Sequence, residues 1–138
     1  MEGGNRFMQQ RQNTLTADHS DAAISVLIVD DDDAVRLVAS EMLAAQGCEV
    51  VCASSGKECL EILDNLSFDL VLLDVGMPDM TGVEVYHLLR AGRPAQKVAF
   101  LTGYAMGEIT DLDDELVSIV AKPFSMDSLA EAIKFSVA

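Results

Sequence analysis

The chain has 138 residues, half of them hydrophobic, and its 9 Lys and Arg against 23 Asp and Glu give a formal net charge of −14. This length and composition predict one domain with a single core. The acidic balance argues against direct nucleic-acid binding, which needs clustered cations, and no apolar stretch reaches the roughly 20 residues of a membrane span. A soluble cytoplasmic domain is expected, with its three cysteines as buried, unpaired thiols.

The predicted elements begin after a polar leader. Residues 1–22 show no sustained hydrophobic period, which predicts a flexible segment ahead of a domain over residues 23–138. In chain order, the following pattern predicts strand 24–29, helix 34–46, strand 49–53, helix 56–65, strand 70–74, helix 83–90, strand 97–101, a short irregular helix within 107–114, strand 117–121 and helix 126–135. Five βα units predict an α/β fold in which helices cover both faces of a parallel sheet.

Several local signals mark the helices. Gly47 and Gly92 follow helical segments at positions where a left-handed residue is favoured. The spacing of a capping box occurs twice, in Ser55 with Glu58 and in Thr81 with Glu84. In the first helix, spacings of three and four residues predict a core-facing apolar stripe of Val35, Val38, Met42 and Ala45.

Carboxylates gather where two predicted strands end. Four consecutive aspartates follow the first apolar run, and Asp74 ends the third. The carboxyl ends of parallel strands share one edge of a sheet, so these acids are expected side by side, although adjacent carboxylates repel by about 1 kcal/mol even in water. A hard cation such as Mg²⁺ relieves that repulsion, and Asp30, Asp31 and Asp74 fit its preference for few carboxylates. Asp32 and Asp33 are interpreted as solvated acids at the positive end of the first helix.

The loop after the third strand has features of a reactive site. Asp74 is followed by Gly76, which permits close approach, and by Pro78, which stiffens the loop. This arrangement suits a carboxylate nucleophile facing a phosphoryl group, while a plain helix-initiating loop is the alternative. At the end of the fourth strand, Thr102 and Gly103 offer a hydroxyl and a backbone N–H to a phosphate oxygen.

Lys122 brings a cation to the same edge at the end of the fifth strand. The following Pro123 favours a cis peptide bond that aims the lysine. Taken singly, a surface lysine or a Thr-Gly pair carries little information. Polar groups at the ends of strands one, three, four and five form a regular pattern that scattered surface residues would not produce.

At these residues the sequence resembles the response-regulator receiver domain of two-component phosphorelays. The resemblance extends from residue 24 to the end, and its matching stretches are 26–31 with Arg36, 72–78 with Gly82, 100–104 and 120–124. It implies a flavodoxin-like fold, which is a doubly wound sheet of five parallel strands in the order 2-1-3-4-5 with helices on both faces. The alternation of apolar runs and amphipathic segments agrees with that fold.

The resemblance also implies the chemistry. Asp74 would accept a phosphoryl group from the phosphohistidine of a histidine kinase or histidine phosphotransfer protein, with Mg²⁺ as the cofactor. The implied metal ligands are Asp30, Asp31, Asp74 and the Gly76 carbonyl. The groups implied to bind phosphoryl oxygens are Thr102, Lys122 and the backbone N–H groups of Val75 and Gly103. Such a domain is not an ordinary enzyme, but a phosphoacceptor that assists its own phosphorylation and dephosphorylation.

Two positions modify this expectation. Many receivers carry an aromatic switch residue three positions before the lysine, where this chain has Ile119, so aromatic switching is not expected. Tyr104, two residues after Thr102, either replaces that switch or gates access to the phosphate. Gly76 leaves the site open to water, which predicts a short-lived phosphoaspartate.

The sequence ends just after the last predicted helix, so signalling is expected to pass through protein contacts. The resemblance implies a downstream protein target on the face formed by the fourth helix, fifth strand and fifth helix. Self-association through this face is left open, as is the choice between a free regulator and the receiver of a hybrid sensor histidine kinase.

Two rival functions remain. A Mg²⁺-dependent phosphatase or phosphotransferase with an aspartate nucleophile would share the acid cluster. Asp30 and Asp32 have its D-x-D spacing, but Ala34 stands where its threonine belongs. A receiver-like binding module that is never phosphorylated is the other rival, although none of the five site residues is replaced.

Overall fold

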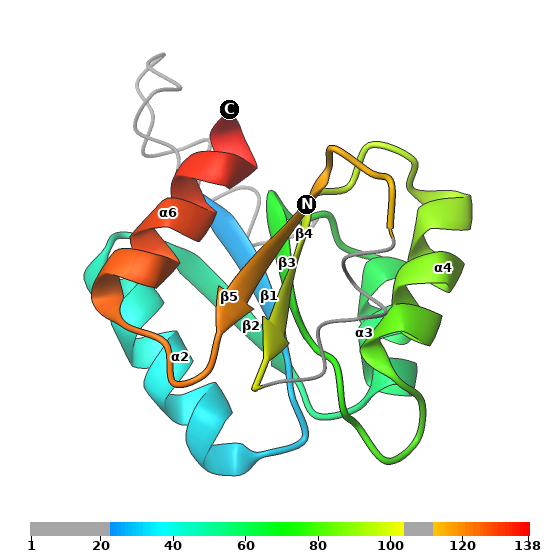
Figure 1. The fold of residues 1–138 in the computed structure, drawn as a ribbon, viewed down its shortest axis with the longest axis horizontal. Coiled ribbons are helices and arrows are strands. Elements are labelled where there is room, and N and C mark those ends of the chain that lie inside the picture. The colour runs from blue at the N-terminus through cyan, green and yellow to red at the C-terminus, as the bar shows by residue number, and fades with distance from the viewer. Residues whose placement is uncertain (1–22, 104–111) are drawn as a thin grey trace.

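The computed structural model describes residues 23–103 and 112–138 (Figure 1). In chain order its elements are β1 (Ser25–Val29), α2 (Asp33–Ala45), β2 (Glu49–Ala53), α3 (Gly56–Leu63), β3 (Leu70–Asp74), α4 (Gly82–Gly92), β4 (Val98–Thr102), β5 (Val117–Ala121) and α6 (Met126–Val137). The predicted leader, Tyr104 and most of the predicted helix 107–114 lie outside the described residues, and residues 112–114 are not helical. Within the described ranges, no helix has both the length and the apolar character to cross a bilayer.

The five strands form one parallel sheet in the order β2-β1-β3-β4-β5, which confirms the predicted fold. Helices α2 and α6 cover one face of the sheet, and α3 and α4 cover the other (Figure 1). Val26 and Ile28 of β1 pack on the α2 side, whereas Leu27 and Val29 pack on the α3 side. A strand that is buried on both faces needs apolar residues at every position, and this explains the continuous apolar runs in the sequence.

Asp32 caps α2, as predicted for an acid at the start of this helix. Its carboxylate accepts a hydrogen bond from the Ala34 N–H at 2.8 Å, and the helix begins at Asp33, one residue before the predicted start. The predicted apolar stripe is only partly right: Met42 packs against the core, but the fully buried residues are Ala39 and Leu43, and Ala45 is exposed. The helix carries two overlapping apolar stripes. Val38, which belongs to the predicted stripe, is 46% exposed.

Of the two glycines predicted to end helices in a left-handed conformation, only Gly47 does so. Gly47 has a φ of 88° and closes α2 in a Schellman motif. Gly92 is instead the last residue of α4, whose C-cap is Arg93. The Arg90 guanidinium donates to the carbonyl groups of Arg93 at 3.0 Å and Gln96 at 2.6 Å. This side chain therefore ties the chain that follows α4 back to the last turn of the helix.

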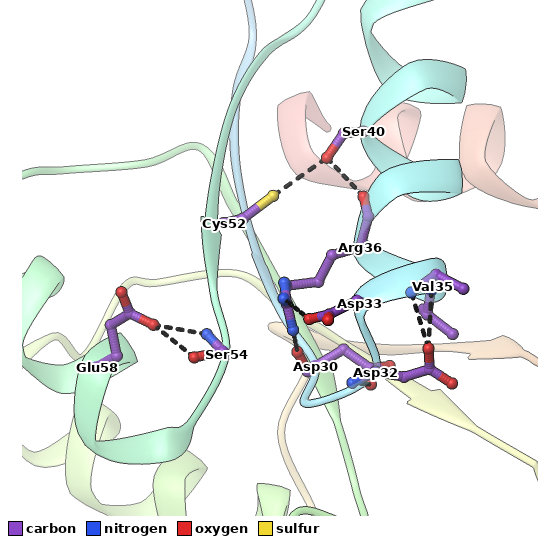
Figure 2. A network of polar contacts seen from close by, with 10 residues as sticks. Asp30, Asp32, Asp33, Val35, Arg36, Ser40, Cys52, Ser54 and Glu58 are labelled. Atoms are coloured by element: carbon purple, nitrogen blue, oxygen red, sulfur yellow. Dashed lines mark hydrogen bonds and ion pairs between the residues drawn. The ribbon is translucent and has the colours of Figure 1, made fainter.

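One of the two predicted capping boxes is complete. In α4, the Glu84 N–H donates to the Thr81 hydroxyl at 3.1 Å and the Thr81 N–H donates to the Glu84 carboxylate at 2.8 Å. In α3, Ser55 accepts from the Glu58 N–H, but the Glu58 carboxylate accepts from the Ser54 N–H at 2.7 Å (Figure 2). The hydrogen bond that completes a capping box therefore comes from the N–H of Ser54, one residue before the predicted Ser55.

All three cysteines are free thiols, as predicted, but they are not all buried. Cys59 is buried in the core, and this burial raises the pKa of its thiol to about 12. Cys52 is exposed, because it lies on β2 at the edge of the sheet. The prediction of a buried thiol is wrong at this position.

Candidate functional site

The structure brings the polar ends of four strands together at one edge of the sheet. Asp30 directly follows β1, Asp74 is the last residue of β3, Thr102 is the last residue of β4, and Lys122 directly follows β5. Because all the strands are parallel, these residues share the carboxyl edge, where open α/β sheets bind their ligands.

Lys122 bridges two of the carboxylates. Its Nζ lies 2.8 Å from Asp30 Oδ2 and 2.8 Å from Asp74 Oδ1. The side chain of Asp30 is 1% exposed and that of Asp74 9% exposed, against 26% for Lys122. The backbone N–H of Lys122 donates to the Thr102 carbonyl at 2.9 Å, and the bond between Lys122 and Pro123 is cis, as predicted. The lysine is thus the most exposed of the three side chains.

Asp30 is held on every side, whereas Asp31 is not. The second carboxylate oxygen of Asp30 accepts from the Asp32 N–H at 2.9 Å, and the backbone N–H of Asp30 donates to Ala53 at 3.2 Å. Its backbone carbonyl accepts from Arg36 Nη1 at 2.8 Å (Figure 2). Asp31 is exposed, and within the described part of the chain its carboxylate makes no hydrogen bond or ion pair. Asp30 is therefore a fixed acid and Asp31 an available one.

The acids outnumber the cation that neutralises them. Carboxylate oxygens of Asp30, Asp31 and Asp74 all lie within 4.8 Å of one another. Burial raises the pKa of Asp74, and the neighbouring charges of Asp30 and Asp31 add to this effect despite the hydrogen bond from Lys122. Burial by itself would lower the pKa of Lys122, but the hydrogen bonds to Asp30 and Asp74 raise it on balance. The ammonium stays charged, and the site still has an excess of negative charge.

This donor set fits a magnesium ion. Mg²⁺ prefers oxygen ligands and usually combines one or two carboxylates with water and phosphate oxygens. The trio of Asp30, Asp31 and Asp74 offers carboxylate oxygens from an exposed residue and two buried ones. A divalent cation would also relieve the repulsion that raises the pKa of Asp74.

A pocket of about 280 Å³ opens beside Asp74. Its lining residues are Asp74, Val75, Gly76, Leu101, Thr102, Gly103 and Lys122. The hydroxyl of Thr102 is buried and finds no hydrogen-bond partner among the described residues. A buried, unpaired polar group costs about 1–3 kcal/mol, so a ligand oxygen in the pocket would relieve this cost. At Gly76 and Gly103, a side-chain carbon would meet no atom of the described residues within 4 Å.

Two sequence-predicted residues are placed differently from the rest. The Val75 N–H donates to the Leu101 carbonyl at 3.2 Å, which continues the pairing of β3 with β4, so the structure does not bring this donor to the pocket. Ile119 is half-buried in β5 and packs against the core on the α3 side.

Sequence reasoning missed a carboxylate that anchors the loop after Asp74. Asp79 accepts from the N–H groups of Gly56 at 3.2 Å and Lys57 at 3.0 Å, which are the first two residues of α3. No local motif predicts this contact, because the partners are more than twenty residues apart. Gly82 is needed for a related reason, since a side-chain carbon there would lie 2.3 Å from the Asp74 carbonyl oxygen. Both features hold the loop close to the site.

An apolar pocket of about 270 Å³ lies on the other side of Lys122. It is lined by Ala34, Val35, Val38, Lys122, Pro123 and Phe124. Lys122 is thus shared between the polar pocket and an apolar surface formed by the start of α2 and the loop before α6.

Comparison with known proteins agrees with this geometry. A family model for the response regulator receiver domain matches residues 26–134. The chain is 39% identical over 114 residues to the sensor kinase CckA of Brucella abortus, covering 80% of this chain and 12% of that protein. It is 31% identical over 111 residues to sporulation initiation phosphotransferase F of Bacillus subtilis, covering 79% of this chain and 90% of that protein.

A solved structure supports the same relationship. The response regulator TrrA of Thermotoga maritima, in complex with Mg²⁺–BeF, matches with a TM-score of 0.74 at 32% identity, covering 82% of this chain and 98% of that one. Two of the curated relatives are much longer proteins, of which this chain spans 23% and 12%.

Proposed function

We propose, since this chain belongs to the response regulator receiver domain family, that it accepts a phosphoryl group on the Asp74 carboxylate from a phosphohistidine of a partner protein. The observation that carries the proposal is the position of Lys122, whose ammonium lies 2.8 Å from both Asp30 and Asp74 at the mouth of a pocket with an unpaired Thr102 hydroxyl. Phosphoryl transfer mainly requires positioning and charge neutralisation, and these groups offer both.

The proposed step is a direct transfer. An Asp74 carboxylate oxygen forms a bond to phosphorus while the bond to the donor imidazole nitrogen breaks, and that nitrogen keeps the bonding electron pair. Lys122 neutralises charge on one phosphoryl oxygen, and the Thr102 hydroxyl and Gly103 N–H donate to others. The Val75 N–H takes no part, because it is bonded to Leu101. A bound Mg²⁺ would supply further charge neutralisation, with ligands from Asp30, Asp31, Asp74 and the Gly76 carbonyl.

The donor is proposed to dock over the apolar pocket beside Lys122. A phosphohistidine that reaches Asp74 brings its own protein surface against the residues around the pocket mouth. Ala34, Val35, Val38 and Phe124 present an apolar surface there, and Val38 is 46% exposed. Apolar side chains in such a position suit a protein partner, because their burial contributes favourably to association. Histidine kinases and histidine phosphotransfer proteins are the donor classes that carry this chemistry.

The phosphorylated domain is proposed to act through protein contacts. The phosphoryl group adds about 1.5 to 2 negative charges to the site and gives the Thr102 hydroxyl a partner. Movement of Thr102 would be transmitted to β5 through its backbone contact with Lys122. The downstream target is proposed to bind the face that includes β5 and α6.

One structural observation speaks against the rival phosphatase. In this chain the second acid of that class's D-x-D pair would be Asp32. The Asp32 carboxylate is instead bonded to the backbone N–H groups of Ala34 and Val35 at the start of α2.

The test is the intact mass of the purified protein after incubation with acetyl phosphate and Mg²⁺. The expected result is a gain of one phosphoryl group that is absent in Asp74→Asn and retained in Asp64→Asn, an exposed aspartate at the end of α3. Steady release of phosphate from added phosphomonoesters would support the phosphatase. The absence of any modification would support the binding module and overturn the proposal.

A further inference from the structure

Arg36 contacts the peptide group that joins the first two acids. Its Nη1 donates to the Asp30 carbonyl at 2.8 Å, and that carbonyl belongs to the peptide bond between Asp30 and Asp31 (Figure 2). The strand pairing of β1 ends at Val29, so this peptide lies beyond the regular ladder. The guanidinium is the side chain that fixes the orientation of this peptide plane.

The geometry of the helix makes this contact firm. Arg36 lies in the first turn of α2, and helical side chains lean back over the preceding turn. Its Nη2 pairs with the Asp33 carboxylate, and its own carbonyl accepts from the Ser40 hydroxyl at 2.6 Å (Figure 2). The Arg36 side chain is only 19% exposed. Because the guanidinium is planar and its side chain is mostly buried, the bond from Nη1 to the Asp30 carbonyl restrains the peptide.

The consequence falls on Asp31 and not on Asp30. The carboxylate of Asp30 is already fixed by Lys122 and by the Asp32 N–H. The Asp31 carboxylate has no partner among the described residues, so its direction depends on the peptide plane that precedes it.

We infer that Arg36 is a positioning residue for the cation site: it holds the peptide between Asp30 and Asp31 so that the Asp31 carboxylate faces the other two acids. This inference rests on the proposed function, because it assumes that the three acids bind Mg²⁺. Residues that orient metal ligands commonly affect affinity by about 10–100-fold when they are replaced.

Electrostatics and positioning predict opposite effects, which makes the inference testable. Arg36 is a cation beside a cation site, so removing its charge would by itself strengthen Mg²⁺ binding. If the residue instead orients Asp31, its removal weakens binding. If a variant that lacks the positive charge of Arg36 binds Mg²⁺ more weakly, the change in charge therefore cannot be the cause.

The experiment measures the Mg²⁺ dissociation constant by titration calorimetry, together with thermal stability without Mg²⁺. Arg36→Met should weaken binding by about 10-fold or more. Arg36→Lys keeps the positive charge but loses the planar guanidinium that donates to two groups at once, and it should also weaken Mg²⁺ binding. It is the milder variant if Arg36→Met does not fold. The matched control is Arg93→Met, because Arg93 likewise donates to backbone carbonyl groups, including Leu66 at 3.2 Å, but lies away from the acids.

The control should lose stability without losing affinity for Mg²⁺. Unchanged or tighter binding in folded Arg36→Met or Arg36→Lys would overturn the inference and leave the proposed function intact. If the wild-type protein bound no Mg²⁺, the inference and the metal part of the proposed function would both be overturned.

Discussion

Two partly buried clusters in this molecule combine carboxylates with a cation, and they behave in opposite ways. The rim cluster consists of Asp30, Asp31, Asp74 and Lys122 at the carboxyl edge of the sheet. The clamp cluster consists of Tyr86 and Arg90 on α4 and of Asp114, which lies shortly before β5. In the rim cluster three carboxylates lie beside one ammonium, which pairs with two of them, whereas in the clamp cluster one carboxylate meets a guanidinium and a phenol.

In the clamp cluster, both oxygens of the Asp114 carboxylate accept hydrogen bonds. Asp114 Oδ2 accepts from the Tyr86 hydroxyl at 2.5 Å and from Arg90 Nε at 3.0 Å, and Asp114 Oδ1 accepts from the Leu116 N–H at 2.8 Å. Burial opposes ionisation of Asp114, but these hydrogen bonds and the charge of Arg90 lower its pKa. The pKa of Asp74 moves in the other direction. Both clusters contain partly buried acids, so the ratio of acids to donors decides whether a cluster stabilises the fold or is ready to receive a cation.

The largest expected difference between the clusters is in phosphorylation. Lys122→Ala should lower the initial rate of phosphorylation by acetyl phosphate by about 10²–10³-fold, because a charged donor to the phosphoryl oxygens is lost. Lys134→Ala removes an equal charge from an exposed position on α6 and should leave the rate unchanged. Intact mass against time measures both rates. A Lys122→Ala rate within a few-fold of the wild-type rate would show that the rim cluster does not depend on its cation.

The clamp cluster should dominate stability instead. Asp114→Ala should lower the free energy of unfolding by about 2–3 kcal/mol, because it leaves Arg90 and Tyr86 without their shared partner. The neighbouring Asp113 is exposed, so Asp113→Ala should change stability by less than about 0.5 kcal/mol. Urea unfolding of the two variants gives the comparison. Equal effects would mean that the clamp contributes no more than a surface acid.

The clamp also shows why one part of the molecule was predictable from sequence and another was not. The strands of the sheet are continuous apolar runs, so their positions, and the meeting of Asp30, Asp74 and Lys122 at one edge, follow from parallel topology alone. The acidic stretch before β5 carries no pattern that tells which acid turns inward. Asp114 does so because Tyr86 and Arg90 lie opposite it, 28 and 24 residues earlier in the chain.

The role of Arg36 was hidden for the same reason. The sequence places it in a matching stretch of the family, but its contact with a backbone carbonyl has no signature of its own. Side-chain-to-backbone contacts depend on helix starts, and the start of α2 lies one residue before the predicted one.

The pH dependence of stability should reveal the clamp on the acid side. The folded-state pKa of Asp114 is lowered, so its contribution is complete above the unfolded-state pKa of about 3.9 and is lost as the pH falls through the lower folded-state value. The difference in unfolding free energy between the wild type and Asp114→Asn should therefore shrink at acidic pH. Urea unfolding between neutral and acidic pH measures this gap. A gap that stays constant would exclude a stabilising charge on Asp114.

In the rim cluster, by contrast, removing a carboxylate should increase the stability of the fold. Asp74→Asn removes one of three crowded carboxylates, so in buffer without divalent ions it should raise the free energy of unfolding by about 1 kcal/mol. Adding Mg²⁺ should stabilise the wild type more than the variant and reduce this advantage. Urea unfolding with and without Mg²⁺ tests the prediction. Destabilisation by Asp74→Asn in the absence of Mg²⁺ would show that Lys122 already balances the acids.

The smallest expected effect concerns the lifetime of the phosphorylated form, where the openness of the rim cluster matters more than its charge. Gly76 is exposed, and a side-chain carbon there would meet nothing within 4 Å in the described part of the chain, which suits access of water to Asp74 from this side. The phosphoaspartate should decay in minutes and not in hours. Gly76→Leu should lengthen the lifetime several-fold by screening the phosphorus from water. Gly92→Leu, at an equally open position at the end of α4, should not change it.

Decay of the phosphorylated mass after removal of acetyl phosphate measures these lifetimes. A wild-type half-life of many hours would contradict the prediction, because it would mean that another group already shields the site. An unchanged lifetime in Gly76→Leu with rapid decay in the wild type would instead place the attacking water on the side of Gly103, which also lines the pocket. The clamp cluster offers no comparable opening, since each oxygen of the Asp114 carboxylate already accepts a hydrogen bond from the protein.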